Sequence, residues 1–243
     1  MLFNLFWGDW TILVMIPAML FALIAQARVK STFDKYDRVE TARRISGAEA
    51  ARRILDRNGL YHVRVERISG RLTDHFDPRE NVIRLSDATY GSTSVAALGV
   101  AAHEAGHAVQ HAVGYFPIKV RAAIIPVTQL GSKLSMPIFL IGFLLSSFAY
   151  VDPYVGGVIM AVGIGLFSLV ALFQTVTLPT EFNASSRALK TLEACGFLYG
   201  DEVSGARRVL SAAAMTYVAA LASSLATILR LVILAIGASN RRR

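Results

Sequence analysis

The chain contains several long stretches without a charged side chain, and the first lies near the N-terminus. Residues 10–27 form an uncharged run of 18 residues, which as a helix would cover roughly 27 Å, close to the ~30 Å hydrocarbon core of a bilayer. Positive charges, beginning with Arg28, follow this run, whereas a signal peptide carries them before its apolar segment. Trp7 and Trp10 suit an interfacial aromatic belt at the other end. Residues 1–30 are therefore predicted to be an uncleaved transmembrane anchor.

Three more apolar stretches follow in the second half of the chain. Two uncharged runs flank Asp152, so residues 134–180 are predicted to be a transmembrane hairpin with a short turn. A further run begins at residue 209 and continues past Arg230, which either snorkels to an interface or faces a partner inside the bundle. Residues 209–243 are predicted to form a last apolar, transmembrane helix with a basic tail. The pattern indicates a mainly α-helical, polytopic membrane protein with about four transmembrane helices.

The polar part between the first two apolar regions shows mixed periodicity. A capping box at residues 46–49 starts an amphipathic helix that ends at an Asn-Gly pair. Alternating apolar and polar residues predict a strand over 61–66. A second strand is expected over 82–86, after the turn signal Asp77-Pro78. Ser and Thr N-caps then precede a long helix of small residues over 95–113. Residues 31–133 are therefore predicted to be a small α+β module.

Composition agrees with a membrane protein and excludes several other classes. Of 243 residues, 54% are hydrophobic and only 17% are charged, and the mean hydropathy is +0.48. Soluble domains usually carry about 25% charged residues, so an ordinary soluble enzyme is disfavoured, and the apolar content excludes a disordered chain. The one cysteine, Cys195, rules out an intrachain disulfide.

The net charge of +8 is distributed unevenly along the chain. Seventeen Lys and Arg lie within residues 28–133 and four more within 187–208, whereas none precedes residue 10 or falls in the turn at Asp152. The positive-inside rule therefore predicts that residues 31–133 and 181–208 are cytosolic; only the Arg triplet at the C-terminus opposes this topology. Ten acidic residues are interspersed with the fourteen basic residues of positions 28–90, so no nucleic-acid partner is expected.

One motif carries chemistry. In His103-Glu104-Ala-Gly-His107 the two histidines are four residues apart, so on a helix both imidazoles can reach one Zn²⁺, with Glu104 next to the remaining position as a proton acceptor and donor. The residues around the motif are uncharged, as expected for a buried, metal-bearing helix. The alternative is that both histidines merely bond backbone carbonyls, which would bury polar groups at a cost.

A catalytic zinc needs a third protein ligand. His111 is eight residues beyond His103, about 12 Å along a straight helix, and is more reasonably an outer or interfacial residue. Glu181 is the better candidate, because Pro179 and Thr180 are predicted to end one helix and to cap a new one there. The alternative for Glu181 is a first-turn glutamate favoured by the helix dipole.

Four segments of the chain together resemble a known family. HEAGHAVQH, the preceding DHFDPRENVIRLSDATY and the following LPTEFNASSRAL and GARRVLSAAAMTYVAAL resemble the YugP-like family of bacterial membrane zinc metallopeptidases, over nearly the whole chain from Phe33. More distantly, HExxH followed by a glutamate helix resembles the HtpX and CAAX-protease group. That group commonly has Asp where this chain has Ser185, so the contact to the metal ligands is expected to differ.

The resemblance implies roles for particular residues. It implies Zn²⁺ bound by His103, His107 and Glu181, with Glu104 as the catalytic base, and a zincin-like form for the α+β module. In such folds an edge strand pairs with extended substrate, and Val82–Ser86 is expected to be that strand, with Asn81, Arg84 and Ser86 along its rim.

The sequence thus predicts a zinc-dependent metalloendopeptidase in a bacterial plasma membrane, with its active site on the cytosolic side. Its partners would be the bilayer and a peptide or membrane-protein substrate. Two alternatives stay open: an intramembrane site-2-type metalloprotease, and a catalytically inactive, zinc-containing membrane scaffold. His62, His75, Arg187 and Tyr217 each could stabilise the oxyanion, and no spacing singles one out. The substrate and the oligomeric state are equally open.

Overall fold

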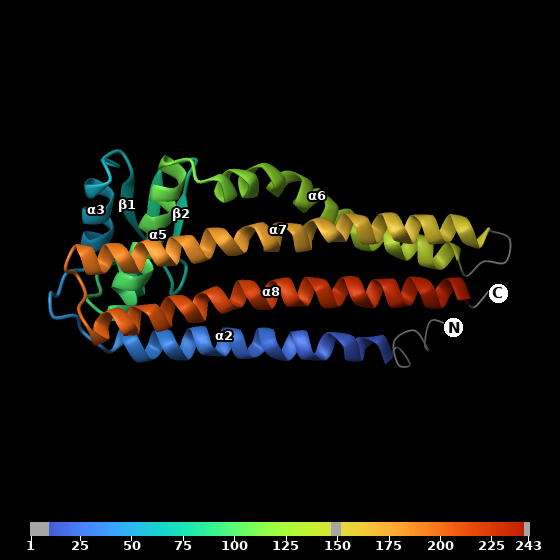
Figure 1. Ribbon diagram of the computed structural model, residues 1–243, viewed down its shortest axis with the longest axis horizontal. Coiled ribbons are helices and arrows are strands. Elements are labelled where there is room, and N and C mark those ends of the chain that lie inside the picture. Colours follow the sequence, from blue (N-terminus) through green and yellow to red (C-terminus); the bar gives the residue numbers. More distant parts are fainter. Residues whose placement is uncertain (1–9, 147–151, 241–243) are drawn as a thin grey trace. The chain divides into compact units, whose positions relative to one another are not determined.

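The computed structural model describes residues 10–146 and 152–240, which form a mainly helical protein with one small sheet (Figure 1). The predicted roles of Trp7, of the hairpin turn and of the C-terminal Arg triplet fall wholly or partly outside these residues. The chain divides into two compact units. The first comprises Met1–Ile24, Val120–Val176 and Tyr217–Arg243, and the second comprises Ala25–Lys119 and Thr177–Thr216. The elements are η1 (Trp10–Met15), α2 (Ile16–Asp37), α3 (Gly47–Arg57), β1 (Arg64–Ile68), β2 (His75–Asp77), β3 (Val82–Ser86), α4 (Asp87–Tyr90), α5 (Val95–Ala112), α6 (Phe116–Leu145), α7 (Pro153–Ala194) and α8 (Asp201–Asn240).

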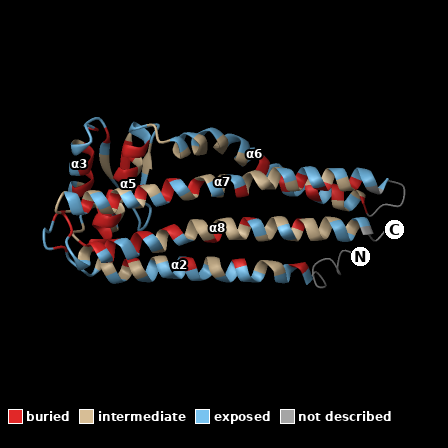
Figure 2. Cartoon of the chain, in the orientation of Figure 1, coloured by how far each residue is buried: buried red, intermediate tan, exposed pale blue. Residues whose placement is uncertain are grey.

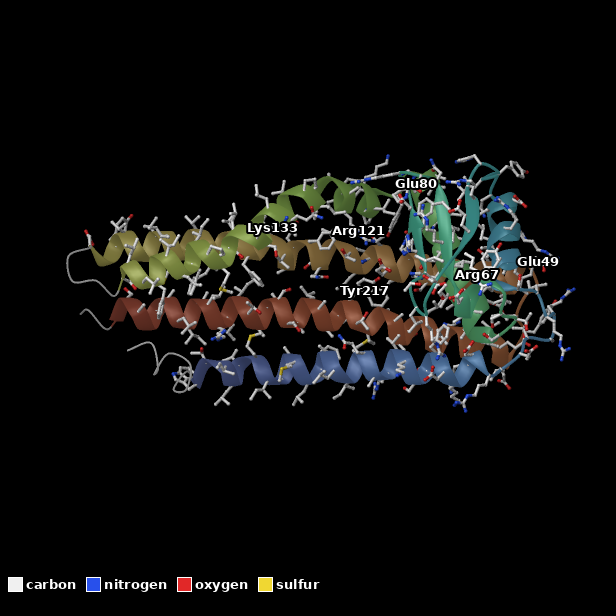
Figure 3. All side chains as sticks on the ribbon, turned by 180° about the vertical axis from the view of Figure 1, so that it is seen from behind. Glu49, Arg67, Glu80, Arg121, Lys133 and Tyr217 are labelled. Atoms are coloured by element: carbon white, nitrogen blue, oxygen red, sulfur yellow. The ribbon has the colours of Figure 1, made fainter. Side chains whose placement is uncertain are left out.

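Four helices are long and apolar enough to cross a membrane, as the pattern of uncharged runs predicts. They span Trp10–Asp37, Phe116–Leu145, Tyr154–Ala194 and Asp201–Ser239. The second begins well before its uncharged run, and Arg121 and Lys133 project from it (Figure 3). The described residues therefore contain four candidate membrane spans, each continuous with a more polar segment or flanked by one.

The new helix expected to begin at Glu181 is not observed. Thr180 is buried inside α7, which continues through Pro179 to Ala194, so Thr180 is not an N-cap. A proline inside a helix removes one backbone hydrogen bond, and apolar spanning helices tolerate this because neighbouring groups satisfy the freed carbonyl. Glu181 is consequently held on one long, continuous helix.

In the first unit, helices α6 and α7 approach closely at glycines. A Cβ atom on Gly163 would lie 2.8 Å from the backbone of Phe139, and one on Gly142 would lie 2.6 Å from the backbone nitrogen of Met160. Phe139 and Met160 pack with Leu231 of α8 in one buried cluster. Small residues that allow backbones to approach are typical of helix packing in membranes.

Arg230, whose environment the sequence left open, has a partner in the same unit. Its Nε donates to the hydroxyl of Thr11 at 3.3 Å, and Thr11 is buried. This arrangement fits the alternative in which the arginine faces a partner inside the bundle rather than an interface.

In the second unit, three strands form a sheet in the order β1-β3-β2. β1 pairs with β3 in parallel, with Arg64 opposite Val82, and β2 pairs with β3 antiparallel, with Phe76 opposite Ile83. Val82–Ser86 is therefore the central strand, and the expectation that it is a free edge for substrate is wrong. Its rim residues are also occupied, since Ser86 is fully buried and bonds Asp74.

The first strand lies a few residues later than the alternation predicts. Arg52 of α3 donates to the carbonyls of Leu60 and Val63, so these two carbonyls are satisfied by a side chain and not by a strand partner. The strand consequently starts at Arg64. Figure 3 labels Glu49, Arg67 and Glu80 among the charged side chains of this unit.

Most residues of α5, the helix that carries the HExxH motif, are buried (Figure 2). The predicted N-cap is confirmed, because the Ser94 hydroxyl accepts from the Ala97 backbone nitrogen at 3.1 Å. Ser46 caps α3 in the same way, through the backbone nitrogen of Glu49. The α5 side chains pack against α3, the sheet, and the unit's portions of α7 and α8. Because α5 is packed on several sides, it holds its polar side chains in defined positions.

Candidate metal centre

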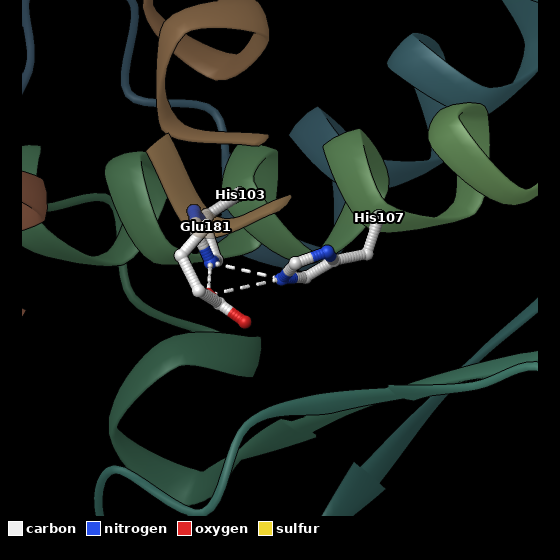
Figure 4. Close-up of side chains that lie close together, drawn as sticks. All are labelled: His103, His107 and Glu181. Atoms are coloured by element: carbon white, nitrogen blue, oxygen red, sulfur yellow. Dashed lines mark hydrogen bonds and ion pairs between the residues drawn. The ribbon is translucent and has the colours of Figure 1, made fainter. Parts of the chain in front are cut away.

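Three polar side chains from two helices converge in the second unit (Figure 4). The Nε2 atoms of His103 and His107 on α5 lie 3.1 Å apart. Oε2 of Glu181, on α7, lies 3.3 Å from the first and 3.4 Å from the second. Glu181 is 2% exposed. Within residues 10–146 and 152–240, this is the only cluster of three or more His, Cys, Asp or Glu side chains close enough to share a metal ion.

The backbone of the two helices explains this convergence. His103 and His107 are one helical turn apart and face the same side of α5. Between them, Gly106 allows α7 to come close: a Cβ atom there would lie 2.9 Å from the carbonyl oxygen of Ala184. A larger residue at position 106 would push the backbone of α7, and with it Glu181, away from the two imidazoles.

The geometry of the three donor atoms fits zinc. Four ligands at about 2.0–2.1 Å in a tetrahedron lie roughly 3.3–3.4 Å from one another, which matches the separations of 3.1, 3.3 and 3.4 Å. Two imidazoles and one carboxylate are a donor set found in catalytic zinc sites, where a fourth position stays open to water or substrate. The residues present could therefore hold a catalytic zinc ion.

A hydrogen-bonded chain behind His107 orients its ring. Gln110 donates from Nε2 to the backbone carbonyl of Thr180 at 2.8 Å and to Oδ1 of Asn183 at 3.0 Å. Asn183 is itself oriented, because the same oxygen accepts from Nε of Arg187 at 2.8 Å. Since a carbonyl can only accept, the amide nitrogen of Gln110 faces Thr180 and its oxygen faces His107.

This orientation selects the tautomer of His107. Oε1 of Gln110 lies 3.0 Å from Nδ1 of His107 and can only accept, so Nδ1 carries the proton. The neutral ring then has its lone pair on Nε2, the atom that faces Glu181 and His103. Gln110 is fully buried, so its hydrogen bond to Nδ1 of His107 is shielded from water. His107 is thereby prepared for binding a cation through Nε2.

The electrostatics of the cluster favour positive charge. Burial of the His107 ring opposes its protonation, but the adjacent Glu181 carboxylate and the negative charge of Glu104 outweigh burial and raise the pKa of His107 above its usual value. Glu104 is only 8% exposed. On the other side of the cluster, the Ser185 hydroxyl lies 3.1 Å from Nδ1 of His103; Ser185 is one helical turn after Glu181, so both face α5 from the same side of α7.

Four of the other predicted candidates lie outside this cluster. His111 is exposed at the end of α5, with its ring centroid 6.0 Å from that of Phe76. Of the possible oxyanion groups, His62 and His75 are exposed, and Arg187 is bonded to Asn183. Tyr217 stays open as a candidate for that role.

Comparison with known proteins supplies the family. A family model described as "putative neutral zinc metallopeptidase" matches residues 11–236. The chain is also 46% identical to "Putative membrane protease YugP" of Bacillus subtilis (strain 168) over 223 residues, covering 92% of this chain and 95% of the relative. The chain belongs to the YugP-like family. No solved structure matches it. These relatives and the apolar helices together indicate a membrane zinc metallopeptidase.

In this YugP-like chain, Gln110 was missed by reasoning from the sequence. Two signals mark it in hindsight: it is a polar residue on a helix that is mostly apolar outside the HExxH motif, and it lies one turn after His107. Its partner Asn183 and the arginine that bonds Asn183, Arg187, are likewise one turn apart on α7. Periodicity shows that residues share a helix face, but not that two separate helices meet there.

Replacing Gln110 with Leu is expected to weaken zinc binding by about 10–100-fold, the usual effect of removing an outer hydrogen-bond partner of a metal ligand. The variant loses the acceptor for Nδ1 of His107 and leaves the Thr180 carbonyl without this donor. Zinc affinity measured by competition with a chromophoric chelator tests this. Gln110→Glu keeps the acceptor and should recover part of the affinity, whereas the exposed Gln129→Leu should change nothing. An unchanged affinity in Gln110→Leu would remove Gln110 from the site.

Proposed function

We propose that this chain is a zinc-dependent endopeptidase that cleaves polypeptides at the cytosolic face of a bacterial plasma membrane. The observation that carries the proposal is the approach of Nε2 of His103, Nε2 of His107 and Oε2 of Glu181 to within 3.1–3.4 Å of one another. A donor set of this kind with a buried glutamate one residue from the first ligand supports peptide hydrolysis.

In the proposed mechanism, each side chain of the site has a separate role. When bound, zinc would polarise the scissile carbonyl and acidify the attacking water. Glu104 takes the proton released by that water and delivers it to the nitrogen of the leaving amine, which completes the cleavage of the C–N bond. His103, His107 and Glu181 hold the ion, and Gln110 keeps the His107 ring in the orientation that the site requires.

Substrate is proposed to add to β2. This strand is hydrogen-bonded to β3 on one side only, and it is the edge strand that packs against α5, where Phe76 meets His111. A peptide in extended form could pair with its outer edge through backbone hydrogen bonds, which would hold it without a strong demand on side chains. β2, and not Val82–Ser86, is thus the strand proposed to pair with extended substrate.

The sidedness rests on the distribution of charge. Residues 31–133 and 181–208 contain most of the Lys and Arg of the chain, and the positive-inside rule favours the cytosol for them. The metal cluster falls within these ranges. Within the described part of the chain, α5 is not one of the four helices suited to spanning a membrane, which favours the cytosolic proposal over the intramembrane alternative. The inactive alternative needs a closed, four-ligand site, and three candidate ligands cluster in the described ranges.

Sealed vesicles from cells producing the full chain test both the activity and its side. Inverted vesicles, which expose the cytosolic face, are expected to cleave fluorescein-labelled casein. This cleavage should stop after treatment with 1,10-phenanthroline and resume when zinc is restored. Vesicles carrying Glu104→Gln give the background from host proteases. Equal cleavage by inverted vesicles that carry the wild-type chain and by those that carry Glu104→Gln would contradict the proposed activity. Cleavage by right-side-out vesicles alone would contradict the proposed side of the membrane.

A further inference from the structure

A pocket of about 420 Å³ lies between α2 and α8 in the second unit, within the roughly 300–1,000 Å³ range of small-molecule sites. Arg28, Lys35 and Tyr36 line it from α2, and Arg208 and Met215 line it from α8. Each set falls on one face of its helix, because the positions are spaced by about four or seven residues. The pocket therefore runs along the groove between the two helices.

The three cations of this pocket are not neutralised by carboxylates. No Asp or Glu lines the pocket, and among residues 10–146 and 152–240 none forms an ion pair with Arg28, Lys35 or Arg208. A second pocket, of about 380 Å³, lies on the other side of α2 and differs in this respect. Its Arg71 is paired with Asp34 and Asp37. The α2–α8 pocket differs from this second pocket in that none of its three cations forms an ion pair among the described residues.

The pocket also lies where both helices change from polar to apolar. Arg28 is the first charged residue after the uncharged run 10–27, and Arg208 is the last before the uncharged run 209–229. Both flanking runs belong to candidate membrane spans. Met215, on the apolar side of α8, continues the lining beyond Arg208. A ligand here would meet positive charge next to the apolar surface of two spanning helices.

The wall of the pocket is fixed in place by α8. A Cβ atom on Gly205 would lie 2.7 Å from the ring of Tyr36, so the ring packs directly on the α8 backbone. The Tyr36 hydroxyl accepts from Nη1 of Arg208 at 3.2 Å, which holds the guanidinium at the pocket. Lys35 Nζ lies 5.5 Å from the centre of the same ring. Lys35 and Arg208 are therefore positioned around the Tyr36 ring before any ligand binds.

We propose that the α2–α8 pocket binds the phosphate headgroup of an anionic phospholipid, with the acyl chains along the apolar stretches of the two helices. Guanidinium and ammonium groups are the usual partners of phosphate, and basic pockets between transmembrane helices are typical headgroup sites. A phospholipid combines the negative charge that the three cations lack with the apolar tail that the adjoining surface suits. The inference rests on the membrane location and not on the proposed peptidase activity.

Binding of pyrene-labelled phosphatidylglycerol to the full chain in dodecyl maltoside micelles tests this inference. The wild-type protein should bind the lipid saturably and more tightly than labelled phosphatidylcholine. Each cation near a lipid phosphate contributes about fivefold to affinity, so Arg28→Gln should weaken binding about fivefold, and the triple variant Arg28→Gln/Lys35→Gln/Arg208→Gln roughly a hundredfold. Retained zinc content and thermal melting report that the variants fold.

A charge-matched variant distinguishes lipid binding at the pocket from a general effect of net charge on lipid affinity. Lys30→Gln/Arg38→Gln/Arg207→Gln removes the same net charge from neighbouring positions that do not line the pocket, and it should keep most of the affinity. Equal losses in the two triple variants would overturn the site. Equal binding of phosphatidylcholine would overturn its preference for anionic lipid. Inorganic phosphate that displaces the lipid at comparable concentration would mean that the site serves a soluble phosphate compound, and would overturn the lipid assignment.

Discussion

Replacing Glu104 with Gln is expected to reduce peptide hydrolysis by about 10²–10⁴-fold, the usual contribution of general acid–base catalysis, while zinc remains bound. The amide has nearly the shape of the carboxylate but cannot take a proton from water. Because Glu104 is not one of the three clustered donor groups, its replacement leaves the metal ligands in place. The measurement is the initial rate of casein cleavage per zinc-loaded chain, with zinc counted in the same samples.

A control for this variant is available on α7. Glu193 is exposed and lies on the same helix as Glu181, so Glu193→Gln removes the same charge away from the cluster and should cleave at the wild-type rate. Wild-type turnover in purified Glu104→Gln would rule out Glu104 as the base. A loss of zinc together with activity would instead show that Glu104 helps to bind the metal.

Replacing Glu181 with Ala is expected to lower zinc affinity by more than the 10–100-fold typical of an outer partner, because it removes one of three protein ligands. Glu181 is buried, with Oε2 within 3.4 Å of both imidazoles, so water alone would have to replace it. Elemental mass spectrometry of the dialysed protein measures the zinc per chain, and chelator competition gives the affinity.

The conservative and distant variants guard against a folding defect. Glu181→Gln keeps the side-chain volume and should bind zinc more weakly than wild type yet more strongly than Glu181→Ala. Glu193→Ala should bind zinc as wild type does. If Glu181→Ala kept a full zinc complement at unchanged affinity, Glu181 would not be a ligand, and His111 would return as a candidate.

Local signals in the sequence predicted what is local in the structure. Ser46 and Ser94 cap the helices that they were expected to cap, and the uncharged runs predicted the four long apolar helices. Both features depend on residues within a few turns of one another. The HExxH spacing placed His103 and His107 on one helix face for the same reason.

Features that depend on distant segments were not accessible in this way. The order of the strands is decided by pairing between segments, so the turn signal before Val82–Ser86 could indicate a strand there without showing that the strand is central. Pro179 signals a helix end locally, but α7 continues through it. Gln110 became recognisable as part of the site only when the structure brought it against Thr180 and Asn183 of another helix.

The most direct test of the central claim is anomalous diffraction at the zinc edge from crystals of the purified full chain. We expect one zinc peak, with three protein donors from His103, His107 and Glu181 and a water in the fourth position, as catalytic sites require. A peak elsewhere in the chain would contradict the assignment of the site. Four protein donors without a water would indicate a structural zinc and contradict the proposed peptidase.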